Sequence, residues 1–339
     1  MKTIAVIYCP KDNGHLVFKN KIFNSIPSYL KKIILHRIVP IWKYLEIPEL
    51  KVKVCMIQFP CDRDTLGLLA ESKISKYCSR IELLLKKLEF ENVVLDDGIE
   101  KHKSIVDYFN SLEGICLFNG KKIFTLYLEE IIRSICKLLS VSINDLRIGI
   151  IADRLDVEKE CLIKRLVTEL RFLSIVSPNY KNMVKLTEKI YEDTGLVITV
   201  SDDDKNVFKE CNIVINFSND SEFVNNCKLY EHTIVVNYGV KIQKKNSKGV
   251  IISGLNMYSN KFSLKTYTWL GQLNFCEALV SQNDIITSNI DNKRDFEINY
   301  INELKKIGYR ISGFVGCNGN IAKEEFDYLA QNYKKKRTI

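Results

Sequence analysis

The sequence predicts an α/β protein with two lobes, in which long helices bridge the lobes and the second lobe is a doubly wound parallel sheet. Short apolar runs alternate along the chain with segments of helical spacing. Strands that are apolar on both faces are typical of parallel sheets, which helices cover on both sides. The chain has 339 residues, enough for about two domains at ~150 residues each.

The middle third of the chain carries the clearest alternation. Leu146–Ile151 is a compact apolar run, and Val157–Leu173 follows it with apolar residues at helical spacing. Further strands are expected at Phe172–Val176, Leu196–Val200, Cys211–Phe217, Thr233–Asn237 and Gly249–Ile252, and further helices at Met183–Asp193, Asp202–Glu210 and Phe223–Cys227. Strands separated by helices pair in parallel, so residues 146–252 are predicted to form one mainly parallel sheet of Rossmann type.

The flanking thirds show shorter patterns. Strands are expected at Thr3–Tyr8, Val52–Phe59, Asn92–Leu95 and Gly114–Phe118, and helices at Ile74–Leu88, Lys103–Leu112, Phe124–Leu139, Tyr267–Val280 and Phe296–Ile307. The glycine-rich Gly313–Asn320 is interpreted as a turn near the junction of the lobes. The predicted domains are an N-terminal α/β lobe (1–121), a bridging helix and linker (122–145), a Rossmann-like lobe (146–262) and C-terminal helices that return to the N-terminal lobe (263–339).

Composition excludes several classes of protein. The net charge is +9, from 50 basic and 41 acidic residues, which falls short of a nucleic-acid-binding footprint. No apolar run approaches the ~20 residues that a membrane-spanning helix needs. The eleven cysteines contain no C-x-x-C pair and have no histidine at metal-ligand spacing, so neither a metal site nor a disulfide framework is predicted. A reducing cytoplasm is the simplest compartment for such a chain.

Four segments resemble those of a known superfamily. Residues 118–151 have the spacing of a glycine turn, a long helix and a first Rossmann strand, and Asp156-Val157 falls in the nucleotide loop. Thr233–Leu255 and Asn274–Val280 match a strand–turn–strand pattern and the helix that follows it. The chain resembles the shikimate dehydrogenase-like NAD(P)-dependent oxidoreductases, and within them the long-chain acyl-(acyl-carrier-protein) reductases. The resemblance implies a dinucleotide and a small-molecule or acyl substrate.

The expected dinucleotide loop lacks its glycines. A dinucleotide site needs glycines after the first strand so that the pyrophosphate can approach backbone N–H groups at a helix N-terminus. Ala152, Leu155 and Glu158 stand at those positions, and Asp153 and Asp156 add negative charge beside them. We therefore expect Glu158, in the first helical turn, to take the place of a bound phosphate. Arg154 offsets only part of this charge.

The second strand ends without the carboxylate that an NAD site places there for the ribose. Ser177, Asn179 and Lys181 follow that strand instead, and they suit the 2′-phosphate of NADP. Any dinucleotide bound is therefore expected to be NADP, and otherwise none. The alternative is that Asn179 is an ordinary turn former and that the lysine is solvated.

The resemblance also supplies candidates for chemistry. Cys276 lies on the helix that carries the acyl-accepting cysteine of the reductases, although that cysteine aligns with Asn274, on the opposite face of a helix. Cys276 is thus either the nucleophile or a packed core residue. Lys121 is the second catalytic candidate, since a lysine there can hold a carboxylate or phosphate. The candidate substrate contacts are Asn119, Lys122, Gln272 and Asn274.

Two functions from different classes follow from the sequence. The first is an NADP-dependent reductase of an acyl or carbonyl substrate with an atypical cofactor loop. The second is a non-catalytic Rossmann-fold protein that binds a ligand or a protein partner through the inherited crevice. The glycine-free loop favours the second, and the rarity of recognisable non-catalytic relatives of enzymes favours the first.

Overall fold

The computed structural model describes residues 2–10, 27, 30, 41–202, 207–242, 249–259, 271–281 and 301–337. The chain forms two compact units. The first unit comprises residues 1–123, 257–290 and 302–310, and the second comprises 124–256, 291–301 and 311–339. Both units are α/β, and each is described by itself below.

The first unit is built on a five-stranded sheet of order β2-β3-β1-β4-β5. Its strands are β1 (Lys2–Tyr8), β2 (Ile41–Ile47), β3 (Val52–Gln58), β4 (Asn92–Leu95) and β5 (Cys116–Phe118). All pairs are parallel except β2 with β3, which is antiparallel. The sequence does not predict β2, an edge strand whose apolar residues are interrupted by Lys43 and Glu46.

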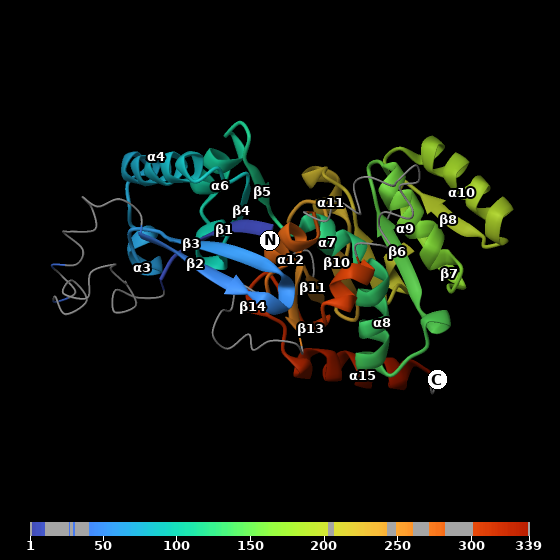
Figure 1. Cartoon of the computed structure of the whole chain (residues 1–339). Coiled ribbons are helices and arrows are strands. Elements are labelled where there is room, and N and C mark those ends of the chain that lie inside the picture. Colours follow the sequence, from blue (N-terminus) through green and yellow to red (C-terminus); the bar gives the residue numbers. More distant parts are fainter. Residues whose placement is uncertain are drawn as a thin grey trace. The chain divides into compact units, whose positions relative to one another are not determined.

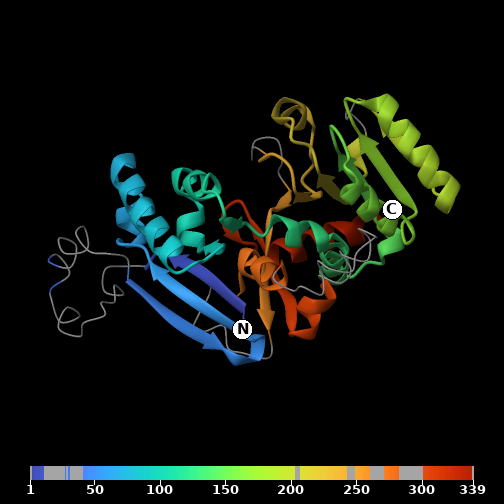
Figure 2. The ribbon, with the colours of Figure 1, turned by 45° about the horizontal axis from the view of Figure 1, so that its top comes forward.

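Helices cover this sheet through an apolar core. They are α3 (Arg63–Leu66), α4 (Glu71–Lys87), α5 (Asp97–Glu100), α6 (Lys103–Asn110) and α12 (Leu273–Ser281), with a short η2 (Pro48–Leu50) between β2 and β3. The apolar faces of α4 and α6 pack with β1, β3 and β4 into one cluster, and α4 and α6 lie side by side over the strands (Figures 1 and 2). α12 packs on β4 and β5. The core therefore holds the strand ends in fixed positions.

The second unit contains a six-stranded sheet of order β11-β10-β9-β6-β7-β8. Its strands are β6 (Arg147–Ile151), β7 (Phe172–Val176), β8 (Ile198–Ser201), β9 (Ile213–Asn216), β10 (Ile234–Asn237) and β11 (Val250–Ile252), and all neighbours pair in parallel. This is the 3-2-1-4-5-6 order of the dinucleotide-binding Rossmann fold. The structure confirms the parallel sheet predicted for residues 146–252.

The helices of the second unit differ in part from the prediction. They are α8 (Leu128–Leu139), η3 (Ile143–Asp145), α9 (Val157–Val167), α10 (Tyr180–Thr194), η4 (Val207–Lys209), α11 (Ser221–Asn226) and α15 (Lys323–Arg337). The helix expected at 124–139 is divided at Tyr127, where ψ of 7° leaves the helical range, into α7 (Lys121–Leu126) and α8. α9 ends at Val167, so the helix expected over 157–173 is too long; the chain returns to the sheet at Phe172.

The C-terminal part of the chain contains strands that the sequence analysis does not predict. Residues 313–320, interpreted as a turn, belong to β13 (Tyr309–Gly316) and β14 (Gly319–Asn320), an antiparallel pair in a small sheet with β12 (Gly254–Ser259). The left-handed φ of Gly319 closes this hairpin. α15 belongs to the second unit, where it packs on α8, instead of returning to the first.

Two other expectations reach beyond the described residues. The described part of the helix expected at 267–280 begins at Leu273, and the described part of the helix expected at 296–307 is helical over 301–306. Within the described ranges, no helix combines the length and the apolar character needed to cross a membrane.

Candidate functional site

The carboxyl ends of β1, β3, β4 and β5 form one edge of the first unit, which we call the first edge. The connection after β1 leads to β2 on one side of β1, and the connection after β3 leads to β4 on the other side, so the direction of the connections reverses at β1. Ligands of open α/β sheets bind outside the carboxyl ends of strands at such a reversal. Cys9 follows β1, Arg63 follows β3 and Asp96 follows β4. The polar residues that follow these three strands therefore lie together at the first edge.

Asp96 joins these strand ends. Its Oδ1 accepts the Ile99 N–H at 3.0 Å, which caps α5, and its Oδ2 accepts the Cys9 N–H and an Arg63 Nη2–H, each at 3.1 Å. Burial raises the pKa of Asp96 to about 6, although Arg63 and the Cys9 N–H lower it. Asp97 Oδ1 accepts a second bond from Arg63 at 2.6 Å. Asp96 is therefore a buried carboxyl group held by three donors.

Gly98 allows this arginine to lie where it does. A Cβ at Gly98 would come within 2.5 Å of Arg63 Nε, so a larger residue would displace the guanidinium. The same Nε donates to the Cys9 carbonyl oxygen at 3.3 Å. The glycine in the Asp96-Asp97-Gly98 segment thus has a packing role at the first edge.

Glu100 is the most perturbed carboxyl group in the described part of the first edge. The Glu100 residue as a whole is exposed, but desolvation of its carboxyl group and the nearby charges of Asp97 and Asp96 raise its pKa to about 7, while Lys121 lowers it. A carboxyl group with a pKa near neutrality, at the ligand-binding edge of a parallel sheet, marks a candidate site for proton exchange or for binding a cation.

Most of the predicted substrate contacts lie close together beside this group. Asn119 Oδ1 accepts the Lys121 N–H at 3.0 Å at the start of α7. Gly120 has a left-handed φ of +74°, and a Cβ there would come within 2.7 Å of the Asn274 nitrogen, so the turn packs directly on α12. Asn274 Nδ2 donates to the Leu95 carbonyl oxygen at 2.6 Å, one residue before Asp96.

The remaining predicted residues of the first unit have distinct environments. Gln272 directly precedes α12, and its Oε1 atom is buried without a hydrogen-bond partner among the described residues. Lys122 lies in the first turn of α7. Cys276 is fully buried and interacts with Tyr309, and burial raises its thiol pKa well above the usual value. A thiol that stays protonated in a closed core is a poor nucleophile, so the geometry favours the packing role of Cys276 over catalysis.

The loop after β6, at the carboxyl edge of the second unit, runs from Ala152 to Asp156. Asp156 is the N-cap of α9, where its Oδ1 accepts the Lys159 N–H at 2.9 Å and its Oδ2 pairs with Lys159 Nζ at 2.9 Å. The backbone of Glu158 is in the first turn of α9, as predicted, while its side chain lies outside the described residues. Asp156 thus places a carboxylate at the N-terminus of α9.

Asp153 forms hydrogen bonds that connect the loop after β6 to Asn179 and Asn219. Its Oδ1 accepts the Asn219 N–H at 3.0 Å, and its carbonyl oxygen accepts Asn179 Nδ2 at 2.6 Å. Burial would raise the pKa of Asp153, but the hydrogen bonds from Asn219 and Ser218 outweigh it and hold the pKa below its usual value. Asp153 is therefore ionised at neutral pH, and Asn179 bonds to the protein itself.

The other predicted cofactor residues surround this loop. Ala152 and Ser177 are fully buried, and Ser177 Oγ accepts the Asn179 N–H at 3.1 Å. Arg154 and Lys181 are exposed. The structure thus brings the predicted cofactor residues to one edge, where hydrogen bonds within the protein already engage several of them.

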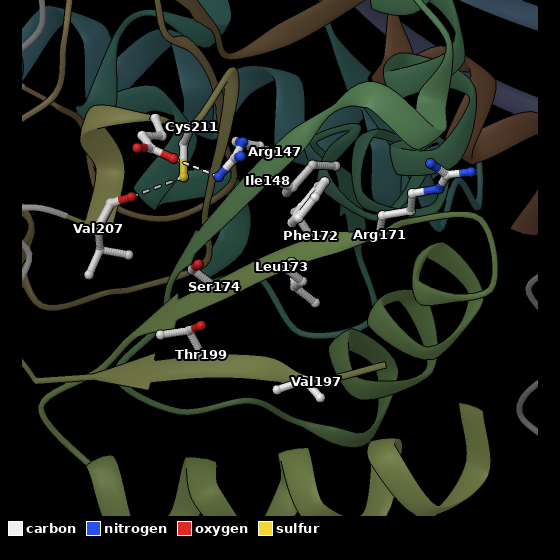
Figure 3. Close-up of a pocket in the computed structure, with 11 residues that line it drawn as sticks. Arg147, Ile148, Arg171, Phe172, Leu173, Ser174, Val197, Thr199, Val207 and Cys211 are labelled. Atoms are coloured by element: carbon white, nitrogen blue, oxygen red, sulfur yellow. Dashed lines mark hydrogen bonds and ion pairs between the residues drawn. The ribbon is translucent and has the colours of Figure 1, made fainter. Parts of the chain in front are cut away.

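A cavity of about 190 Å³ lies at the opposite, amino edge of the same sheet (Figure 3). It forms beside the short η4, where the half-exposed Phe172 ring stacks under Arg147 at 4.5 Å. Arg147 also pairs with Glu210 at 2.6 Å, and the Arg171 side chain extends away from Arg147 in this view (Figure 3). The cavity contains none of the predicted site residues and is smaller than the ~300 Å³ at which ligand pockets begin.

Sequence reasoning misses Arg63, Asp96 and Glu100. The Asp96-Asp97-Gly98 segment is interpreted only as a strand boundary, although an acidic residue directly after a buried strand is a usable signal. Arg63 and Glu100 carry no such signal, because their roles depend on residues tens of positions away in the chain.

Comparisons with known proteins complete these observations. No protein family model matches the chain, and no curated protein sequence does. Among solved structures, the chain is similar to a shikimate 5-dehydrogenase from Listeria monocytogenes in complex with shikimate and NAD, with 10% identity, a TM-score of 0.33, and coverage of 88% of this chain and 96% of that one.

Two further similar structures have other activities. The aspartate transcarbamoylase catalytic subunit of M. jannaschii has 11% identity, a TM-score of 0.29 and coverage of 71% and 74% of the two chains. The Thermococcus litoralis Δ1-pyrroline-2-carboxylate reductase, in complex with NADH and L-proline, has 14% identity and a TM-score of 0.27 over 38% of this chain and 40% of that one. The chain thus spans less than half of that reductase, and at these TM-scores no alignment assigns an activity.

Proposed function

We propose that this chain is a ligand-binding protein with the architecture of a Rossmann-fold oxidoreductase, and that it does not take NAD or NADP at the N-terminus of α9. Its ligand binds instead at the first edge. This is the non-catalytic alternative of the sequence analysis, assigned here to a particular part of the fold.

The observation that carries the proposal is the carboxylate of Asp156 on the N-terminus of α9. The dinucleotide that the fold implies needs free N–H groups and glycines there. The loop 152–156 has no glycine, and Asp153 adds a second ionised carboxylate. At a screening length of ~8 Å, these charges act directly on any bound pyrophosphate. The residues present do not fit the cofactor, so no step of a reaction is derived through it.

The first edge supports a ligand with a cationic or hydrogen-bond-donating nitrogen. Arg63 is already bonded to Asp96 and Asp97. Desolvation and the charges of Asp97 and Asp96 raise the pKa of Glu100, although Lys121 lowers it, so the ionised carboxylate would gain from a further cation. A ligand ammonium group would supply that cation, and the unpartnered Oε1 of Gln272 is a second acceptor in the same unit.

A second candidate function is the reductase of the sequence analysis, and one observation favours it. Glu100, with a pKa of about 7, lies near Lys121 at the edge where the substrate of such an enzyme would bind. A group with a pKa near the working pH suits general acid–base catalysis. This candidate requires measurable NADPH binding.

A thermal-shift titration separates the two candidates. With 1,4-diaminobutane at ~10 times its dissociation constant, we expect the wild-type chain to gain ~1.4 kcal/mol, a rise of a few degrees in Tm. Glu100→Gln should abolish the rise. Glu91→Gln, an exposed carboxylate just before β4 at the other end of that strand, should leave it unchanged. A rise with NADPH and none with the diamine would favour the reductase.

A further inference from the structure

The six-stranded sheet of the second unit carries exposed apolar side chains where β7 and β8 begin. Buried and exposed residues alternate there: Leu173 and Ile198 are buried, whereas Phe172, the first residue of β7, is 46% exposed and Val197, directly before β8, is 73% exposed. Parallel sheets are as a rule covered by helices on both faces, so their strands are buried on both sides. One face of this sheet departs from that rule at the amino ends of two strands.

The connection from β8 to β9 explains why this face is open. In its described part, the connection forms only the short η4, whose Phe208 ring lies over β6: a Cβ at Gly149 would come within 2.7 Å of that ring. Gly149 pairs in register with Ser174, and Ser174 pairs with Thr199. Phe208 therefore covers the β6 position of this row, while Ser174 and Thr199 line the cavity of about 190 Å³ (Figure 3).

The size of this cavity suits one side chain of a partner. An apolar cavity of ~150 Å³ holds a benzene ring, so 190 Å³ has room for one phenyl ring. Free ligands usually occupy pockets of at least ~300 Å³. A side chain on a partner polypeptide needs no larger pocket, because the residues on either side of it add contacts around the rim. Phe172 and Val197 provide that apolar rim.

The charges beside the cavity favour an acidic partner. Arg147 pairs with Glu210 at 2.6 Å and stacks on Phe172 at 4.5 Å, so its charge is already compensated. Arg171 is exposed, extends away from Arg147 (Figure 3) and has no carboxylate partner among the residues that the structure describes. Its guanidinium can therefore bind a carboxylate of an incoming chain. One uncompensated cation falls short of the several phosphate contacts with which proteins bind nucleic acids.

We propose that this open face is a docking surface for an acidic segment of another protein. The segment inserts one aromatic side chain into the cavity, where the ring lies against Phe172, an arrangement that aromatic pairs favour. A neighbouring carboxylate of the segment pairs with Arg171. The surface belongs to the amino edge of the sheet, whereas the loop after β6 lies at the carboxyl edge, so docking is independent of the ligand site proposed above.

Peptide display on the full chain tests this surface. A library of random short peptides is first depleted on the Thr199→Trp variant, in which the indole fills the cavity, and is then selected on the wild type. We expect the enriched peptides to share one aromatic residue with aspartate or glutamate beside it. A synthetic peptide of that sequence should bind at least ~10-fold tighter than its copy with alanine in place of the aromatic residue, because the cavity buries the ring.

Charge variants test the second contact. Arg171→Glu should weaken binding of that peptide at least ~3-fold, whereas Lys185→Glu, an exposed cation on α10 that does not line the cavity, should leave it unchanged. If Thr199→Trp does not fold, Arg171→Glu replaces it in the depletion. The proposal is overturned by enrichment of basic sequences or of none, by tighter binding of single-stranded DNA than of the peptide, or by self-association of the chain that Thr199→Trp or Arg171→Glu abolishes.

Discussion

At the scale of single residues, the two sheet edges use their carboxylates in opposite ways. Asp156 and Asp153 are satisfied by the protein's own N–H groups, and hydrogen bonds hold the pKa of Asp153 low. Glu100 and Asp96 have raised pKa values because burial disfavours their charged forms. A carboxylate that already accepts hydrogen bonds from the protein is less available to a ligand. A carboxyl group whose pKa is raised by desolvation is a candidate for binding one.

The raised pKa of Glu100 gives a pH-dependent stability. The folded state holds its proton up to about pH 7, whereas the ordinary pKa of a glutamate is 4.5, so this group makes the fold less stable as the pH rises between those values. Glu100→Gln should therefore stabilise the chain at pH 8 by about 1 kcal/mol, a value reduced for the partial exposure of the side chain.

Urea unfolding of the wild type and of Glu100→Gln at pH 8 and pH 4.5 measures this effect. The difference in unfolding free energy should shrink toward zero at the lower pH, where both folded chains carry a neutral group. A variant that is less stable than the wild type at pH 8 would show that Glu100 is stabilised by its neighbours rather than strained.

At the scale of elements, the hydrophobic pattern predicts the strands that are buried on both faces. Leu146–Ile151 and Phe172–Val176 are predicted within a residue, because strands buried on both faces must be apolar throughout. β2 and β13 are missed because half of their residues face solvent and give no apolar run. The break at Tyr127 is also missed, since no proline or glycine marks it.

The candidate site depends less on the hydrophobic pattern. The family resemblance points to Asn119, Lys121, Gln272 and Asn274; hydrogen bonds and packing bring Asn119 and Asn274 near the end of β4, and their role in binding stays a prediction. Glu100 is not found, because desolvation of its carboxyl group, the largest cause of its raised pKa, depends on packing that the sequence pattern does not show. That Asp156 caps α9 is likewise seen only from the loop geometry.

α8 and α9 are joined by an ion-pair network that can be tested directly. Glu129 accepts from Arg165 at 2.9 Å and pairs with Arg133 at 3.1 Å, and Arg133 also pairs with Glu169. Burial would raise the pKa of Glu129, but the two arginines lower it overall. Because the folded pKa is depressed, the stabilisation is present above pH 4.5, the ordinary pKa of a glutamate, and is lost as the pH falls through the folded value.

A double-mutant cycle with Glu129→Gln and Arg165→Gln should give a coupling of about 1 kcal/mol at pH 7, which is high for a partly exposed pair, and much less at pH 3. The matched control is Arg147 with Glu210, a more exposed pair between a strand and a loop, whose coupling should stay below ~0.5 kcal/mol. Equal coupling in the two pairs would mean that burial adds nothing to the network.

At the scale of the whole molecule, the second unit has a sheet of the Rossmann strand order, and two carboxylates of the loop after β6, Asp153 and Asp156, accept N–H groups of the protein itself. The apolar core determines the strand order, whereas a few loop residues determine whether a cofactor binds. A chain can therefore keep the Rossmann strand order and lose the cofactor site. The double variant Asp153→Asn, Asp156→Gly removes both charges and should improve NADPH affinity over the wild type.

The matched control for that variant is Asp220→Gly, which removes the N-cap of α11 in the same unit, where the Asp220 carboxylate accepts two N–H groups. It should lose about as much stability as Asp156→Gly, roughly a few tenths of a kcal/mol, without any gain in affinity. An equal gain in both variants would show that loosening the unit, and not the loss of the α9 cap, admits the dinucleotide.

The closure of the α9 N-terminus is tested most directly by a calorimetric titration of NADPH into the wild-type chain. We predict a dissociation constant above ~1 mM, a loss of about 4 kcal/mol relative to a micromolar site. Micromolar binding by the unmodified chain would contradict the assignment of Asp156 as the occupant of the phosphate position and would restore the reductase as the function of this protein.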